Sequence, residues 1–388
     1  MFTALVAPEL FDGNEIHGPK AVLMESGRII GLVNPNEVPS HFQSTVCDTG
    51  MLAPGLIDLQ VNGGGGVLLN NQPDTRALQQ MASGHASVGV SRILPTVISD
   101  TPEVARKVID AVVPMVSDPH SGVLGVHLEG PFFSTAKSGV HRLDALRQIA
   151  NDDWSWLRAA SAVPAIVTLA PECVTQDDIR KLVDLGLRLS AGHTDADYET
   201  VCSAINAGLN GFTHLFNAMS AHNGRAPGVV GAALTRNETW CGLIADGIHV
   251  HPASIQLALS AKPVGKVYLV SDAMATVGTQ DKRFELYGEP IEEVNGRLQN
   301  SQGRLAGSAI SLVDAVQYVY RAQDVSLTES IAMASRYPAE YLRVADQFGS
   351  IRPGYWADFS WWGSDASLKG AWRAGQPLEL FANGGPSL

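Results

Sequence analysis

Residues 165–193 read AIVTLAPECVTQDDIRKLVDLGLRLSAGH, and this stretch decides the fold. It begins and ends with short apolar runs, residues 165–170 and 188–193, which have the length of buried strands. Between them, Thr175 precedes Asp178 as a helix-capping pair, and apolar residues then recur at helical spacing. A strand, a helix and a second strand in this order predict a βα unit with parallel strands.

The same alternation of short apolar runs and longer amphipathic stretches continues along the chain from Met51. Eight such runs are present, which is the number of strands in a closed (β/α)8 barrel of the TIM type. The predicted fold class is therefore α/β. The predicted strands are residues 52–61, 91–98, 123–129, 165–170, 188–193, 211–216, 240–246 and 267–272.

An open doubly wound sheet is the alternative arrangement of alternating strands and helices. Such a sheet normally carries a G-x-G-x-x-G turn after an early strand, where it binds a dinucleotide. Residues 62–67 are rich in glycine but read NGGGGV, which lacks that spacing and has no clear helix after it. The barrel is therefore the first prediction and the open sheet the second.

The two ends of the chain resemble each other and differ from the middle. The first fifty residues contain short apolar runs and turns without a helical pattern, and the same character returns after Leu342. We therefore predict that residues 1–50 and 346–388 form one small β-sandwich domain, and that residues 51–345 form the barrel.

Three further segments of the predicted barrel domain have recognisable patterns. Residues 223–231 are loop-like, residues 284–305 predict a polar hairpin, and helices are predicted near residues 311–322 and 327–342.

The charge and the cysteine content indicate which kinds of partner the protein can bind and in which cellular compartment it works. The 388 residues carry a formal net charge of -12 and no basic cluster, which argues against nucleic acid as a partner. The four cysteines are scattered without a CxxC pair, and no apolar run reaches the ~20 residues of a membrane span. We expect a cytoplasmic protein that does not bind membranes.

Polar residues at the ends of predicted strands select the candidate site, because the active site of a parallel barrel lies at the carboxyl ends of its strands. Glu129, His193 and Asp272 end three of these strands, and His214 lies near the end of a fourth. One carboxylate and two imidazoles form a three-ligand set for a catalytic metal ion with a position open for water. A lone histidine there would more often be a buried structural residue, but three such groups together favour a metal site. Asp272 is then available for proton transfer.

Other histidines and a serine offer alternative chemistry. His127 shares a strand face with Glu129, so it is either a fourth ligand or, as we favour, a residue that supports the ligands. His249 and His251 resemble an HxH pair but follow a turn, and we expect one substrate contact and one surface residue. Ser308 lacks the Gly-x-Ser-x-Gly spacing of a nucleophile elbow, which makes covalent catalysis a minor hypothesis.

Over essentially its whole length the chain resembles N-acetylglucosamine-6-phosphate deacetylases of the amidohydrolase superfamily. The stretches that carry the resemblance are PGLIDLQVNG (54–63), HLEGPF (127–132), SAGHT (190–194), THLFNAM (213–219), ADGIH (245–249), SDA (271–273) and LAGS (305–308). Most superfamily members have His-x-His where this chain has Gln60 and Asn62. Amides are poor ligands for a transition metal, so we expect one metal ion rather than two.

The resemblance implies a role for each matching residue. Glu129, His193 and His214 bind one divalent metal ion, with zinc as the first choice and iron, cobalt or nickel as alternatives, and Asp272 is the catalytic acid and base. Because a developing oxyanion needs a positioned donor, we expect the metal ion or a histidine, His141 or His249, to polarise the carbonyl. The implied substrate contacts are Val140, His141, Asn217, Ala218, Arg225, Asp246, Gly247, Ile248, His249, Leu305, Ala306 and Gly307.

The implied reaction is hydrolysis of N-acetylglucosamine 6-phosphate to glucosamine 6-phosphate and acetate in amino-sugar catabolism, by a homodimer. Two alternatives stay open. One is a deacetylase for the galactosamine or mannosamine epimer or a hydrolase of a cyclic amide on the same scaffold, and the other is a non-catalytic scaffold protein that kept only the fold.

Overall fold

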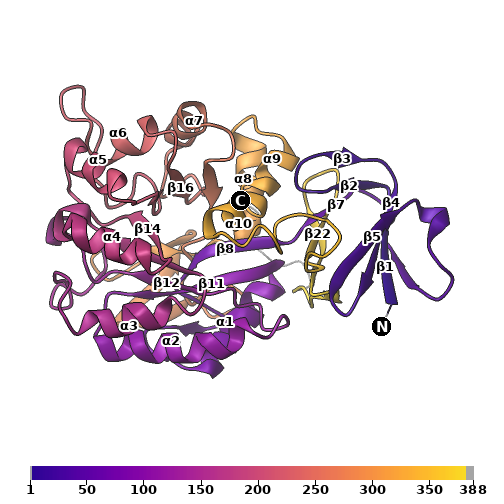
Figure 1. Ribbon diagram of the computed structural model, residues 1–388, viewed down its shortest axis with the longest axis horizontal. Coiled ribbons are helices and arrows are strands. Elements are labelled where there is room, and N and C mark those ends of the chain that lie inside the picture. Colours follow the sequence, from indigo (N-terminus) through magenta and orange to yellow (C-terminus); the bar gives the residue numbers. More distant parts are fainter. Residues whose placement is uncertain (1, 382–388) are drawn as a thin grey trace.

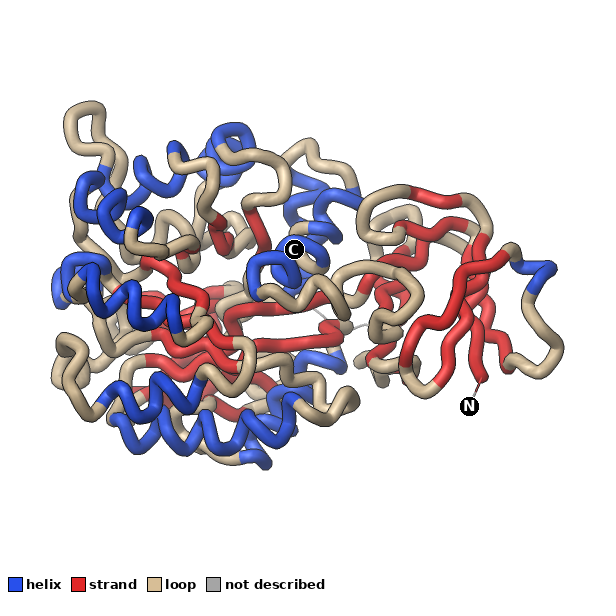
Figure 2. Tube along the Cα trace, in the orientation of Figure 1, coloured by secondary structure: helices blue, strands red, loops and turns tan. Residues whose placement is uncertain are grey.

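The computed structural model describes residues 2–381, which form two parts arranged along the long axis of the molecule (Figure 1). One part is a barrel of strands surrounded by helices, and the other consists almost entirely of strands (Figure 2). Within these residues no helix is both long and apolar enough to cross a bilayer.

The barrel contains all eight predicted strands, in the predicted order and with every neighbouring pair parallel. The first and last strands meet beyond their ends, where Asp272 N donates to Gln60 O at 3.0 Å and Val61 bridges Ala273. The TIM-type fold is therefore confirmed. The strands are β8 (Leu56–Val61), β11 (Val90–Ile98), β12 (Val126–Glu129), β13 (Ala165–Leu169), β14 (Arg188–Ala191), β15 (Gly211–Phe212), β16 (Trp240–Leu243) and β17 (Val267–Leu269).

Helices surround these strands, which are buried along their whole length because side chains cover both faces. Several helices begin at a side-chain cap, as predicted for Thr175, whose hydroxyl accepts from Asp178 N. The helices are α1 (Thr75–Ser87), α2 (Pro102–Val116), α3 (Asp153–Ala160), α4 (Gln176–Asp184), α5 (Tyr198–Asn206), α6 (Gly228–Thr235), α7 (Pro252–Ala261), α8 (Leu312–Ala322), α9 (Leu327–Ala332) and α10 (Arg336–Leu342).

Several predicted segments differ in the structure. The helix predicted over residues 327–342 is two helices, α9 and α10, because Pro338 has no N–H for the carbonyl of residue 334 and would clash with it. The segment 223–231 is a loop only as far as Pro227, after which the apolar residues of α6 are buried against the core. The apolar run 52–61 is likewise two strands, β7 (Met51–Pro54) and β8.

The division of residues 52–61 marks where the chain passes between the two parts. Strand β7 pairs with β2 (Glu9–Phe11) on one side and β22 (Phe359–Trp362) on the other, so strands from both ends of the chain share one sheet. This six-stranded sheet also contains β3 (Ile16–His17), β23 (Leu368–Arg373) and β24 (Gln376–Pro377).

A four-stranded sheet completes the small β domain. It consists of β5 (Arg28–Val33), β4 (Lys20–Glu25), β1 (Phe2–Ala7) and β6 (Gln43–Val46). Leu5 and Val22 of this sheet pack with Leu52 and Phe359 of the other sheet in one buried cluster.

An antiparallel sheet lies beside the carboxyl ends of the barrel strands. The predicted hairpin at residues 284–305 is in fact four strands, β18 (Arg283–Leu286), β19 (Glu289–Val294), β20 (Arg297–Gln299) and β21 (Leu305–Ser308). Leu286 and Leu298 of this sheet pack against Ile98 and Met274, which belong to the cavity described below. A short hairpin, β9 (Gly63–Gly64) and β10 (Val67–Leu68), follows β8.

Candidate metal centre and active site

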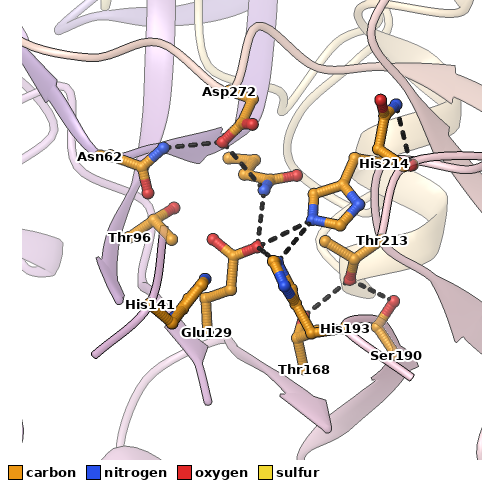
Figure 3. Close-up of polar contacts among 12 residues, drawn as sticks. Asn62, Thr96, Glu129, His141, Thr168, Ser190, His193, Thr213, His214 and Asp272 are labelled. Carbon is orange, nitrogen blue, oxygen red and sulfur yellow. Dashed lines mark hydrogen bonds and ion pairs between the residues drawn. The ribbon is translucent and has the colours of Figure 1, made fainter. Parts of the chain in front are cut away.

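The four residues selected at predicted strand ends lie together at the carboxyl end of the barrel (Figure 3). Glu129 is the last residue of β12, and the other three lie in the turns just beyond β14, β15 and β17. His193, His214 and Asp272 have φ values of 49°, 36° and 54°, a left-handed conformation that is uncommon outside glycine. Three strained residues at one site indicate that the fold holds these side chains where function requires them.

Glu129, His193 and His214 point one ligand atom each at a common position. Oε1 of Glu129 lies 3.1 Å from Nε2 of His214 and 3.4 Å from Nε2 of His193, and the two Nε2 atoms are 3.1 Å apart. All three side chains are buried. The predicted ligand set is therefore assembled in one place.

The chemistry of these atoms fits a cation. Nδ1 of His193 lies 2.9 Å from the carbonyl of Lys137, which can only accept, so Nδ1 carries the proton and Nε2 is left as a lone pair. Burial lowers the pKa of His193, which favours this neutral form. Burial raises the pKa of Glu129, but the contacts with His193 and His214 outweigh it and lower that pKa well below its usual value. A carboxylate beside a bare imidazole nitrogen is suited to a divalent metal ion.

Asp272 faces this centre and is held by the amides of Gln60 and Asn62. Nδ2 of Asn62 donates to its Oδ1 at 2.7 Å, and Nε2 of Gln60 donates to the same oxygen at 3.0 Å and to Oε1 of Glu129 at 3.0 Å. Burial, together with the charge of Glu129, raises the pKa of Asp272 to about 6. The amides therefore hold the second carboxylate, a role that residue type alone does not indicate.

The contacts of His127 favour the supporting role over that of a fourth ligand. Its Nδ1 lies 3.1 Å from Leu59 O and its Nε2 lies 2.7 Å from Oγ1 of Thr168, so protein groups occupy both ring nitrogens. Thr168 is also 2.7 Å from Oγ1 of Thr213, the residue before His214. Figure 3 shows Thr168, Thr213 and Ser190 as a chain of hydroxyls beneath the ligands.

A cavity of about 140 Å³ opens at the centre. It is lined by the three candidate metal ligands, by Asp272 and by seven of the twelve predicted substrate contacts. The seven are Val140, His141, Asn217, Ala218, His249, Leu305 and Gly307. Its other lining residues, which the sequence did not single out as contacts, are Asn62, Ile98, Gly139, Ile244 and Met274.

The other five predicted contacts are not among the residues that line this cavity. Both oxygens of Asp246 are used within the loop: Oδ1 accepts from the N–H groups of Ile248 and His249, and Oδ2 lies 2.6 Å from Nδ1 of His249. Asp246, Gly247 and Ile248 thus shape the turn that presents His249. Ala306 is fully buried in β21. Arg225 is exposed in the turn closed by the bridge between Asn223 and Ala226.

His141 and His249, the two histidines expected as candidates to polarise the carbonyl, have pKa values that are shifted in opposite directions. Burial lowers the pKa of His249, but the bond to Asp246 outweighs it and the net pKa is raised, while its buried Nε2 has no partner within residues 2–381. Burial lowers the pKa of His141 well below its usual value, with His193 adding to the effect. His249 therefore favours a cationic ring and His141 a neutral one.

The chain is similar to known proteins of one enzyme family. A model of the amidohydrolase family matches residues 51–386. An N-acetylgalactosamine-6-phosphate deacetylase of Shewanella sp. (strain ANA-3) is 40% identical over 338 residues, covering 87% of this chain and 85% of that protein. An N-acetylglucosamine-6-phosphate deacetylase of Vibrio furnissii is 32% identical over 378 residues, covering 95% and 93%. The crystal structure of N-acetylglucosamine-6-phosphate deacetylase from Pasteurella multocida matches with a TM-score of 0.93 and 31% identity, covering 97% of this chain and 99% of that one.

Proposed function

Because this chain belongs to the amidohydrolase family, we propose that its cavity binds N-acetylglucosamine 6-phosphate and hydrolyses the acetamide to glucosamine 6-phosphate and acetate. The observation that carries the proposal is the convergence of Glu129, His193 and His214 within 4.8 Å of one another beside Asp272. A non-catalytic scaffold would have no need to keep this set. The reaction places the chain in amino-sugar catabolism, and a cytoplasmic location fits such a role.

The metal ion is one divalent cation, with zinc as the first candidate, held by Glu129, His193 and His214. Such an ion supplies Lewis acidity and can lower the pKa of water to roughly 7. Asp272 takes the proton of the attacking water and later returns it to the leaving amine, because a carboxyl group with a pKa of about 6 can do both near neutral pH. Gln60 and Asn62 hold Oδ1 of Asp272, which leaves Oδ2 for the proton.

The two histidines divide the remaining tasks. His141, which favours the neutral form, donates to the acetamide oxygen as negative charge develops there. His249, which favours the charged form, suits the phosphate. Arg225, an implied substrate contact, is exposed and does not line the cavity of its own chain, and its guanidinium could bind the phosphate bidentately in the cavity of a second copy in a homodimer.

The galactosamine epimer is the second candidate substrate. The observation that favours it is the relative from Shewanella, which is named for that epimer and is 40% identical, against 32% for the relative from Vibrio. The two sugars differ only in the configuration of one hydroxyl, and both carry the acetamide and phosphate that the proposed contacts address.

Acetate release tests the proposal. The purified protein is assayed with the 6-phosphates of N-acetylglucosamine, N-acetylgalactosamine and N-acetylmannosamine, and with unphosphorylated N-acetylglucosamine, each with and without chelator. We expect release from a phosphorylated sugar only without chelator, and the highest kcat/KM identifies the epimer. No release from any phosphorylated sugar would contradict the proposed function.

A further inference from the structure

Ser99, the residue immediately after β11, contacts His141 through two groups. Its backbone N lies 3.2 Å from Nδ1 of His141, with a geometry that makes a hydrogen bond, and its Oγ lies 2.8 Å from the same nitrogen. Both residues are buried, with exposed fractions of 1% for Ser99 and 6% for His141. The sequence gives no indication of this contact, because the two residues are 42 positions apart.

The backbone contact fixes which nitrogen of His141 carries the proton. A backbone N–H can only donate, so Nδ1 of His141 must accept with its lone pair. In the neutral ring the proton then lies on Nε2. The Ser99 hydroxyl, facing the same lone pair, also acts as a donor.

The surroundings hold both partners in place. Phe133 packs edge-on against the ring of His141 with centroids 4.9 Å apart, and His193 packs edge-on at 4.3 Å. On the other side, the hydroxyl of Tyr287 donates to the carbonyl of Ser99 at 2.7 Å. Gly130 leaves room for the serine, because a Cβ at this glycine would lie 2.2 Å from Oγ of Ser99.

Only the Nε2 edge of His141 remains for a ligand. His141 lines the cavity, and within residues 2–381 its Nε2 makes no hydrogen bond with a protein group. Figure 3 shows its ring beside Glu129 and His193, on the side of the centre away from His214. A neutral ring with a proton on this edge can donate to an oxygen in the cavity, whereas the other tautomer could only accept.

From this geometry we infer that Ser99 is a positioning residue for the reaction: it sets the Nε2–H tautomer of His141 and orients that N–H toward the acetamide oxygen of the substrate. The inference rests on the proposed function for the identity of the substrate. The tautomer itself is a property of the protein and can be measured without turnover.

Nitrogen NMR of the zinc-loaded protein labelled with 15N-histidine tests the tautomer directly. His141→Gln identifies the His141 signals, and the chemical shifts distinguish a protonated nitrogen from a bare one. We expect His141 to carry its proton on Nε2 in both wild type and Ser99→Ala, because the backbone N–H remains in the variant. A proton on Nδ1 in the wild type would overturn the inference.

Kinetics test the orienting role. Ser99→Ala removes only the hydroxyl, so we expect kcat to fall roughly threefold to tenfold, as for the loss of one hydrogen bond, with little change in KM. Ser99→Thr keeps the hydroxyl and should restore most of kcat. The matched control is Ser91→Ala, which removes a buried hydroxyl at the opposite end of β11, where Oγ donates to Trp372 O.

The outcomes separate the inference from the proposed function. Equal kcat values for Ser99→Ala and Ser91→Ala would overturn the orienting role even if the enzyme is active. A wild-type protein that releases no acetate from any of the sugar phosphates contradicts the proposed function instead. In that case the NMR result still tests the tautomer of His141, and a proton on Nδ1 overturns the inference.

Discussion

Nδ2 of Asn62 lies 2.7 Å from Oδ1 of Asp272 and donates to it inside the cavity (Figure 3). Here the amide contacts the carboxylate that is assigned to proton transfer, so the position stabilises the charged form of Asp272.

Loss of this amide should change the pH dependence of catalysis. Burial, with the charge of Glu129, raises the pKa of Asp272 to about 6, and the bond from Asn62 opposes that increase. Asn62→Ala removes the opposing bond, so the pKa rises further and the carboxylate persists only at higher pH. We expect the acid limb of kcat/KM to move up by about one pH unit. An unchanged limb would show that Asp272 is not the group that titrates.

Replacement of the carboxylate itself should separate catalysis from metal binding. Asp272→Asn keeps the size of the side chain but cannot accept a proton, so kcat should fall by roughly a hundredfold to ten-thousandfold. Metal analysis of the purified variant should still find one ion per chain, because Asp272 is outside the cluster of Glu129, His193 and His214. A variant with near-normal kcat would exclude Asp272 as the acid and base.

How much of this site the sequence predicts depends on whether a residue's role is local. Residues at the ends of apolar runs, such as Glu129 and His193, can be found because the strands of a barrel direct their carboxyl ends to one place. The roles of Ser99 and Asn62 depend on hydrogen bonds between residues far apart in the sequence. The spacing of apolar and polar residues along the chain does not indicate such bonds. The division at Pro54 was missed for a similar reason, since the run 52–61 is apolar throughout and only its pairing partners differ.

Metal removal should lower thermal stability as well as activity. An ion that binds only the folded chain stabilises it by about 2.7 kcal/mol at a free concentration one hundred times Kd. Chelation should therefore lower Tm, and addition of zinc should restore it, as followed by circular dichroism. Glu129→Gln is the control, since its Tm should respond little to either treatment. A wild-type Tm that is insensitive to chelator would contradict the metal site.

The ion pair between Arg92 and Asp358 should hold the two parts of the molecule together. Nε and Nη2 of Arg92, in barrel strand β11, donate to the two carboxylate oxygens of Asp358 at 2.6 and 2.9 Å, and both side chains are buried. Asp358→Asn leaves a buried charge unpaired and should cost about 3 to 5 kcal/mol of unfolding free energy in urea. Glu292→Gln, which breaks the exposed pair with Arg283, should cost less than about 1 kcal/mol. Similar losses for both variants would contradict this prediction.

His85 should make the folded protein less stable in acid, independently of the metal centre. Its ring is fully buried, Nε2 lies 2.9 Å from the carbonyl of Gly63, and Nδ1 has no partner within residues 2–381. Burial lowers its pKa from 6.5 to about 4, and the positive charge of Arg373 adds to the effect. Between these values the unfolded chain binds a proton that the folded chain does not, so stability falls as the pH falls from about 6.5 toward 4.

The size of this effect can be measured against variants that lack the titrating ring. His85 alone should remove roughly 2 kcal/mol of unfolding free energy between pH 7 and pH 5. His85→Gln keeps a donor near Gly63 but does not titrate, so its free energy of unfolding should depend less steeply on pH than that of the wild type. The matched control is His120→Gln, which makes the same substitution at an exposed position. Parallel slopes for wild type and His85→Gln would mean that His85 is protonated in the folded chain, or that another group causes the acid sensitivity.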